Sequence, residues 1–258
     1  MNYLVPLGIF VLQAILYSFI GLRLGQKSFP DHEDQRAWKA FRTWWMGMGI
    51  NSTINALSVL AFNTGIQYLP LFILFSVTAT LAAASALWGL LTYLLYVYTG
   101  NNRSRLVGSF YVAFALFVFV SIYVFSPAGV AMDGFQVAMQ YNNPPQGAPA
   151  FIYAVAFILL LGLPPVIASI GMFLLYRRVN ENSAKYRAGL VSLGIFMLFG
   201  LSYIVPLMLF PFGLRTGELP WWPITIRMVG IAALALIYFA YFPPVFVKDR
   251  LQVKTVLE

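Results

Sequence analysis

Arg227 is the one charged residue that lies clearly within an apolar stretch long enough to cross a membrane, away from its ends. A guanidinium group at that depth is costly unless it is paired, so it is a functional candidate by default. It can bind the carboxylate or phosphate of an amphiphilic ligand through two hydrogen bonds, assisted by the phenol of Tyr203 and the amide of Asn55. Alternatively, its side chain extends to the outer headgroups or pairs with Glu218 or Asp133. The sequence leaves both interpretations open.

A polar face in segment 42–62 provides the second set of candidates. Asn51, Asn55 and Ser58 are spaced i, i+4 and i+7, so a helix places them on one side. Amide groups in hydrocarbon need partners, so this side should point toward other helices. We interpret it either as packing between helices or as a stripe that contacts a ligand.

Pro164 and Pro165 lie near the middle of the fifth predicted span, and Pro206 lies in the sixth. A proline within a helix removes one backbone hydrogen bond and clashes with the preceding turn, so we expect kinks at both places. The carbonyls freed by a kink face protein or a wet cavity. The kinks are therefore either static packing features or hinges beside a pocket.

Apolar helices must position all of these side chains. The 258 residues are 60% hydrophobic and 9% charged, whereas a soluble domain has about 45–50% apolar and about 25% charged residues. We predict an all-α membrane protein, a seven-transmembrane helix bundle over residues 1–247, followed by a basic cytoplasmic tail over residues 248–258. The predicted helices cover residues 3–24, 42–62, 69–98, 107–125, 150–176, 188–209 and 221–247.

The connecting segments complete this prediction. Residues 31–41 should form a short polar helix leading into the second span, with Asp31 and Asp34 favouring its N-terminus. Residues 126–149 form the longest predicted outer loop, with an apolar stretch at 135–139 that lies on the outer leaflet or over the bundle. The pairs Trp44-Trp45 and Trp221-Trp222 should lie at the membrane interfaces.

The distribution of basic residues predicts the orientation. Almost all of the 16 lysine and arginine residues follow the first, third or fifth predicted span or lie in the tail, and Arg215 is the one basic residue in an opposite loop. Cytoplasmic loops are enriched in lysine and arginine. We therefore expect the N-terminus outside and the C-terminus in the cytoplasm of a bacterial or archaeal inner membrane, with the net charge of +8 reflecting these loops and no nucleic-acid partner.

Missing residue types exclude several functions. The chain has no cysteine and one histidine, His32, so thiolate metal sites, iron–sulfur clusters and histidine-rich centres cannot be built. No Asp or Glu lies within a predicted span, which disfavours proton-coupled pumps. The last predicted span holds no lysine for a retinal Schiff base. We expect no cofactor, no metal and no enzymatic activity.

Two segments suggest a family. Tyr176-Arg177-Arg178 precedes Tyr186-Arg187 in a basic turn, and the last span ends in Tyr238–Pro244, followed by the basic residues 245–257. In this pattern the chain resembles the seven-transmembrane sensor regions of bacterial histidine kinases. The resemblance implies a signalling module after the last span, and none follows Glu258. It therefore implies a stand-alone or truncated sensor, or one that signals through a partner.

The favoured hypothesis is a receptor-like membrane sensor that signals to the cytoplasmic side. Its partners would be the lipid bilayer, a hydrophobic or anionic amphiphilic ligand bound among the helices, and a cytoplasmic signalling protein or another membrane protein. The alternatives are a membrane transporter or pore, and an accessory or scaffold subunit of a membrane complex.

Overall fold

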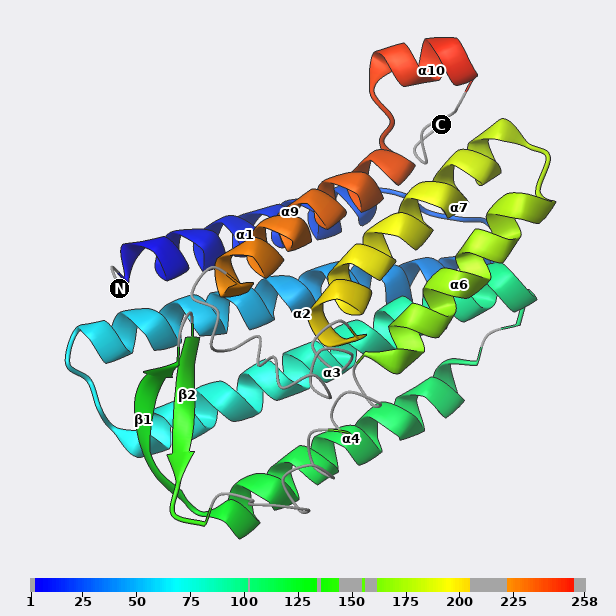
Figure 1. Cartoon of the computed structure of the whole chain (residues 1–258). Helices are drawn as coiled ribbons and strands as arrows, with labels where there is room; N and C mark the ends of the chain where they lie inside the picture. The colour runs from blue at the N-terminus through cyan, green and yellow to red at the C-terminus, as the bar shows by residue number, and fades with distance from the viewer. Residues whose placement is uncertain are drawn as a thin grey trace. The chain divides into compact units, whose positions relative to one another are not determined.

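The computed structural model describes residues 3–101, 103–133, 136–143, 155, 162–204 and 222–252. Most of these residues are helical. In chain order the elements are α1 (Leu4–Leu24), α2 (His32–Asn63), α3 (Leu69–Thr99), α4 (Ser104–Phe125), β1 (Pro127–Asp133), β2 (Gln136–Tyr141), α6 (Leu163–Arg178), α7 (Asn182–Ile195), the π-helix η1 (Phe196–Ile204), α9 (Trp222–Tyr241) and α10 (Val245–Leu251) (Figure 1).

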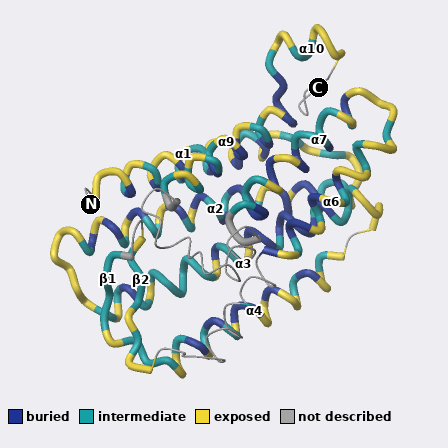
Figure 2. The backbone as a smooth tube through the Cα atoms, in the orientation of Figure 1, coloured by how far each residue is buried: buried dark blue, intermediate teal, exposed yellow. Residues whose placement is uncertain are grey.

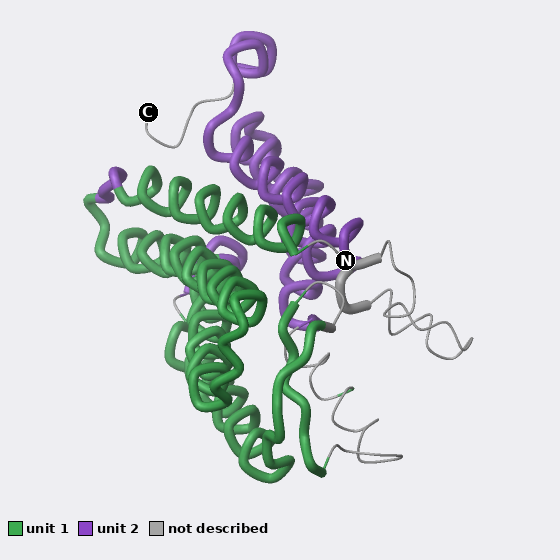
Figure 3. Tube along the Cα trace, turned by 90° about the vertical axis from the view of Figure 1, so that its left-hand side faces the viewer, with its two compact units in different colours: residues 1–25, 30–93, 103–156 green, residues 26–29, 94–102, 157–258 purple. Residues whose placement is uncertain are grey.

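The chain divides into two compact units (Figure 3). Unit 1 comprises residues 1–25, 30–93 and 103–156, and unit 2 comprises residues 26–29, 94–102 and 157–258. Unit 1 therefore contains α1, α2, most of α3, α4 and the two strands. Unit 2 contains α6, α7, η1, α9, α10 and the end of α3.

Five helical stretches among the described residues are long and apolar enough to cross a membrane: α1, α3, α4, Asn182–Leu201 and Ile224–Tyr241. This makes the chain a helical, multi-pass membrane protein. α2 is not among the five because its polar residues lower its hydropathy, and the described helix α6 has only 16 residues. A helix needs about 20 residues to span the hydrocarbon layer.

α2 begins where the sequence predicts a helix start. The side chain of Asp31 accepts hydrogen bonds from the backbone N–H of Glu33, at 2.6 Å, and of Asp34, at 3.3 Å, and these satisfy two of the free amides of the first turn. The helix then continues unbroken to Asn63. The predicted helical structure of residues 31–41 is confirmed from His32 onward, and it is continuous with the predicted second span, because no glycine or proline lies within residues 31–41 and because Trp38 and Phe41 are buried in the core.

Small residues bring the helices of unit 1 close together. A Cβ atom on Gly47 would lie 2.8 Å from the carbonyl oxygen of Ala82 on α3, and one on Gly89 would overlap the backbone of Ala40 on α2. A Cβ on Gly21 of α1 would likewise meet the Sδ atom of Met46 at 2.8 Å. Glycine at these positions permits backbone-to-backbone packing, as is common between membrane helices.

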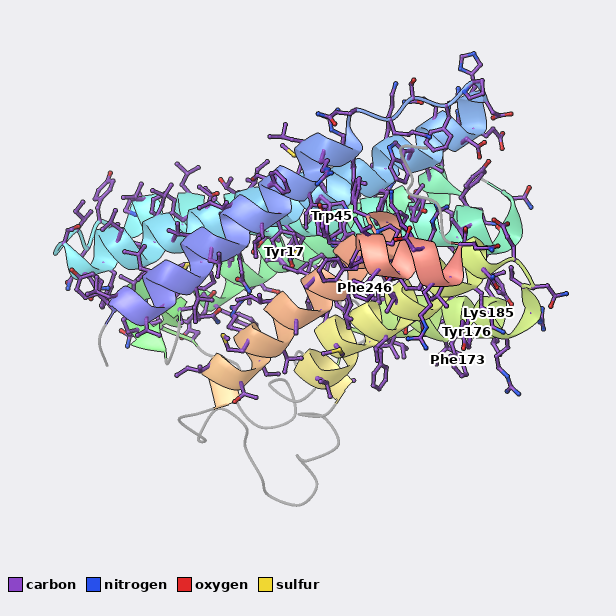
Figure 4. The ribbon with its side chains drawn as sticks, turned by 90° about the horizontal axis from the view of Figure 1, so that it is seen from above. Tyr17, Trp45, Phe173, Tyr176, Lys185 and Phe246 are labelled. Atoms are coloured by element: carbon purple, nitrogen blue, oxygen red, sulfur yellow. The ribbon has the colours of Figure 1, made fainter. Side chains whose placement is uncertain are left out.

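An aromatic cluster fills the space beside these contacts. Trp45 packs against Tyr17 of α1 at a centroid distance of 5.9 Å (Figure 4), and Phe41 stacks on Tyr93 of α3 at 4.3 Å. Trp44 and Trp45 are fully buried, and buried positions continue along this part of α2 (Figure 2). Both rings pack against protein rather than lipid, and their depth at the membrane interface stays a prediction.

The segment after α4 forms a β-hairpin where the sequence analysis expects an irregular outer loop. β1 pairs antiparallel with β2, with Val130 opposite Met139 and Asp133 opposite Gln136. The backbone N–H of Asn142 donates to the carbonyl of Ser126 at 2.9 Å, which closes the hairpin at the end of α4. β2 packs against α2. The all-α prediction therefore omits one element, although alternating residues around Asp133-Gly134 are a hairpin signal.

Unit 2 also differs from the predicted boundaries. The sixth span begins at Asn182 rather than residue 188 and changes from α-helix to π-helix at Phe196. The last span ends at Tyr241 rather than residue 247, because Pro243 has no N–H and disfavours helical backbone at Phe242. The predicted helix ends at residues 150, 209 and 221 lie outside the described residues and stay predictions.

Candidate functional site

The polar face of α2 is hydrogen-bonded to the protein itself. The side-chain amide of Asn51 donates to the carbonyl of Ala79 on α3 at 2.9 Å. The amide of Asn55 donates to the backbone carbonyl of Asn51 at 2.9 Å and to its side-chain oxygen at 3.1 Å. The hydroxyl of Ser58 donates to the carbonyl of Ile54, one turn earlier in the same helix.

These hydrogen bonds indicate that the polar face of α2 takes part in packing within the protein. The bond from Asn51 to Ala79 joins α2 to α3 within the membrane-spanning part of unit 1, where an unpaired amide would be expensive. Asn51, Asn55 and Ser58 are half-buried, so the donor and acceptor groups that these bonds do not use are partly shielded by the protein. A role in contacting a ligand stays a prediction.

A groove that the sequence analysis did not anticipate lies nearby in unit 1. Its volume is about 480 Å³, and α3, α4 and the start of β1 form its walls. The lining side chains are Ile73, Val77, Phe119, Ile122, Tyr123, Ser126 and Pro127. Most of them are aliphatic or aromatic, so the groove suits a hydrocarbon chain or a ring.

The polar groups of the groove lie at one end. Tyr123 is 85% exposed, and the neighbouring Ser126 is a C-cap residue with a positive φ of 51°. That conformation is uncommon outside glycine, and it directs the chain from α4 into the hairpin. The groove therefore combines an apolar wall with hydroxyl groups at the helix–hairpin junction, the arrangement that an amphiphile needs. Sequence analysis missed it because the hairpin that completes it was not predicted.

The predicted site residues do not form one described cluster. Asn51, Asn55 and Ser58 belong to unit 1, whereas Arg227 and Tyr203 belong to unit 2. Arg227 lies on α9 and is half-buried. Tyr203 lies in the π-helix η1, and its side chain is outside the described residues. A pocket shared by Arg227 and the α2 face stays a prediction.

The proline pair has a different setting from the one expected. Pro164 and Pro165 lie in the first turn of α6, which begins at Leu163 after the N-cap Gly162. A missing N–H has no cost at this position, because the first-turn amides have no partner within the helix. The described helix is therefore not interrupted there. Pro206 and residues 156–161 are outside the described residues, so the proposed hinges stay predictions.

The π-helix η1 is the irregular part of unit 2. It covers nine residues that follow α7 without a break, and it packs against α6, α7 and α9. π-Helices are rare, and where they interrupt α-helices they are frequently found at functional sites. Among the described residues of unit 2, η1 is therefore a candidate functional irregularity.

Comparisons with known proteins give no family for the chain. No protein-family model, curated protein or solved structure matches it. Among the described residues, no group of three or more histidine or acidic side chains is placed to bind a metal ion. The functional argument therefore depends on the groove, the polar contacts and the charges of the chain itself.

Proposed function

We propose that the chain crosses the membrane seven times, with its N-terminus outside and its C-terminus in the cytoplasm. The five apolar stretches found among the described residues support this proposal. α2 adds a sixth crossing, because its polar groups are hydrogen-bonded within unit 1. The segment that ends in α6 adds a seventh. Almost all of the basic residues then lie on one side, as expected for a bacterial or archaeal inner membrane.

We propose further that the protein is a receptor-like sensor for an apolar or amphiphilic ligand. The groove between α3, α4 and β1 is the observation that carries this proposal. In the proposed orientation it lies at the outer end of both helices, where a ligand can enter from the outer leaflet. Its aliphatic wall would hold a hydrocarbon part, and Tyr123 and Ser126 would bind a polar group.

The signalling step would use the π-helix. A ligand changes a conformational equilibrium only if it binds one state better than the other. We propose that the two states differ in the geometry of η1 and that the change reaches the cytoplasmic turn between α6 and α7. This turn and the tail would then contact a signalling partner.

Native mass spectrometry of the gently purified protein, with identification of bound small molecules, tests the ligand site. We expect one stoichiometric amphiphile, and we expect Val77→Trp to reduce its occupancy about tenfold or more, since overfilling a packed site costs about 1–3 kcal/mol. Val112→Trp is the matched control, because Val112 is 61% exposed on α4 and does not line the groove.

Two other outcomes would reject the receptor proposal. Bulk lipid alone, with a protein subunit that co-purifies at fixed stoichiometry, would favour an accessory or scaffold subunit. Solute flux across liposomes that contain only this protein would favour a transporter or pore. Equal occupancy in both tryptophan variants would show that the amphiphile binds elsewhere.

A further inference from the structure

α10 lies at the membrane surface for a geometric reason. It begins at Val245, four residues after the last described span ends at Tyr241. Four residues reach at most about 14 Å even when fully extended. The interfacial and headgroup region on one side of a bilayer has a comparable thickness. α10 therefore cannot leave the neighbourhood of the headgroups.

A hydrogen bond holds α10 beside the turn between α6 and α7. The side-chain amide of Asn182, the first residue of α7, donates to the carbonyl of Leu251, the last residue of α10, at 3.3 Å. These residues are 69 positions apart in the sequence. The bond places two basic segments at the same end of unit 2.

Basic side chains are concentrated in these two segments. Arg177 and Arg178 lie in the last turn of α6, and Lys185 lies in the first turn of α7. Lys248 and Arg250 lie in the last turn of α10. Two acidic residues, Glu181 and Asp249, are interspersed among them, so the positive charge predominates at this end.

Apolar side chains project from the same end. Val245 and Phe246 on α10 are each 72% exposed, so α10 presents two adjacent apolar side chains beside its basic residues. At the turn, the Nζ atom of Lys185 lies 5.3 Å above the ring of Tyr176, which in turn stacks with Phe173 (Figure 4). Aromatic rings beside basic groups are typical of protein surfaces at the headgroup level.

We infer that α10 and the α6–α7 turn form a docking surface for anionic phospholipid. Val245 and Phe246 insert among the upper parts of the acyl chains, and Arg177, Arg178, Lys185 and Arg250 bind lipid phosphates. The charge of the surface is complementary to an anionic leaflet, and its apolar groups are complementary to the layer beneath the headgroups. The proposed orientation decides only which leaflet is bound, and ligand binding at the groove is not required.

A site-specific fluorescent label tests this inference in the full chain. The protein has no cysteine, so Val245→Cys provides a single thiol for a bimane group. The labelled protein is placed in nanodiscs of phosphatidylcholine, with or without phosphatidylglycerol, and quenching by brominated acyl chains is measured. We expect phosphatidylglycerol to increase quenching and to shift the bimane emission to shorter wavelength.

Charge variants make the test specific. Each basic residue near an anionic surface changes the docking equilibrium about fivefold. A variant that combines four substitutions should therefore reduce quenching in anionic nanodiscs to the level in neutral ones: Arg177→Gln, Arg178→Gln, Lys185→Gln and Arg250→Gln. The matched control is Arg103→Gln with Arg105→Gln, which removes positive charge near the start of α4 and should leave quenching unchanged.

Salt provides a second measurement that needs no charge variant. Added salt should reduce quenching of the labelled protein in anionic nanodiscs and leave it unchanged in neutral ones, because ions screen the attraction. Bimane emission typical of water in both lipid compositions would overturn the inference and leave the surface to a soluble protein partner. Strong quenching of equal size with and without phosphatidylglycerol would also overturn it, because the basic residues would then have no part in docking.

Discussion

Units 1 and 2 hold their helices together by different means. In unit 1, α2 approaches α3 at Gly47 and Gly89, and packed aromatic rings fill the remaining space. In unit 2, the hydroxyl of Ser169 on α6 donates to the carbonyl of Ser192 on α7 at 2.7 Å, and the hydroxyl of Ser192 donates to the carbonyl of Ser169 at 2.8 Å. Gly194 also lets α7 approach Ile237 of α9.

The two units stabilise the association of membrane helices in two different ways. Lipid chains are as apolar as leucine, so burial of apolar surface does not drive membrane helices together. Unit 1 relies mainly on close contact, which a single added methyl group disturbs. Unit 2 adds a pair of buried hydrogen bonds beside an irregular helix. We therefore expect the two units to respond differently to small changes in side-chain volume and polarity.

The largest effect is expected in unit 1 from Gly89→Ala. The new Cβ would overlap the backbone of Ala40 and lie 2.8 Å from the amide nitrogen of Trp44, so a backbone shift is required. We expect a loss of about 3 kcal/mol, at the upper end of overpacking effects, seen as a lower melting temperature in detergent. Gly8→Ala is the control, because nothing lies within 4 Å of its Cβ, and its stability should be unchanged or slightly higher. Equal stability of the two variants would remove the argument for backbone contact.

A smaller effect is expected in unit 2 from Ser169→Ala or Ser192→Ala. Each variant removes one hydroxyl bond between α6 and α7, and such bonds contribute about 1 kcal/mol between membrane helices. The double variant should cost less than the sum of the single ones, because the first loss already loosens the crossing. Thermal unfolding of the four proteins gives this cycle. Ser109→Ala is the control, since its hydroxyl bonds within its own helix to Arg105. If neither single variant lowers the melting temperature, side-chain volume rather than these hydrogen bonds determines the packing in unit 2.

A difference between two variants separates polar from apolar contributions within unit 1. The indole N–H of Trp38 donates to the carbonyl of Leu24 at 2.8 Å, whereas the indole N–H of Trp45 is buried without a hydrogen-bond partner among the described residues. Both substitutions by phenylalanine lose similar volume, so Trp38→Phe should cost about 1 kcal/mol more than Trp45→Phe. Parallel melting curves measure the difference. The reverse order would show that packing outweighs the hydrogen bond even at the start of α2.

The sequence was most informative where a rule depends on local composition. Apolar length identified α1 and α3 almost to the residue, and the capping preference of aspartate identified the start of α2 at Asp31. Both rules use only neighbouring residues. The predicted end of the last span, at residue 247, was too late. The residues after Tyr241 are still apolar, so hydropathy alone does not mark the end of α9, whereas the proline pair that follows does.

Features that depend on contacts between distant residues were not predicted. The preference of tryptophan for the interface gave no sign that neighbouring helices bury the rings of Trp44 and Trp45. The groove depends on the packing of α3 against α4, with Pro127 of β1 at its edge, and the hairpin depends on pairing between β1 and β2. Asn51 was expected to face another helix, but its partner could not be predicted. The backbone carbonyl of Ala79 accepts the hydrogen bond, and a backbone group cannot be recognised from the residue type.

The unbroken length of α2 has a mechanical consequence. Its 32 residues extend roughly 48 Å at 1.5 Å per residue, from the aspartate cap at one end to the neighbourhood of β2 in the same unit. A helix of this length without proline transmits tilt like a stiff lever. A tilt of about 5° would displace one end by about 4 Å relative to the other, so a small movement of the hairpin would be amplified at Asp31 without any change within α2.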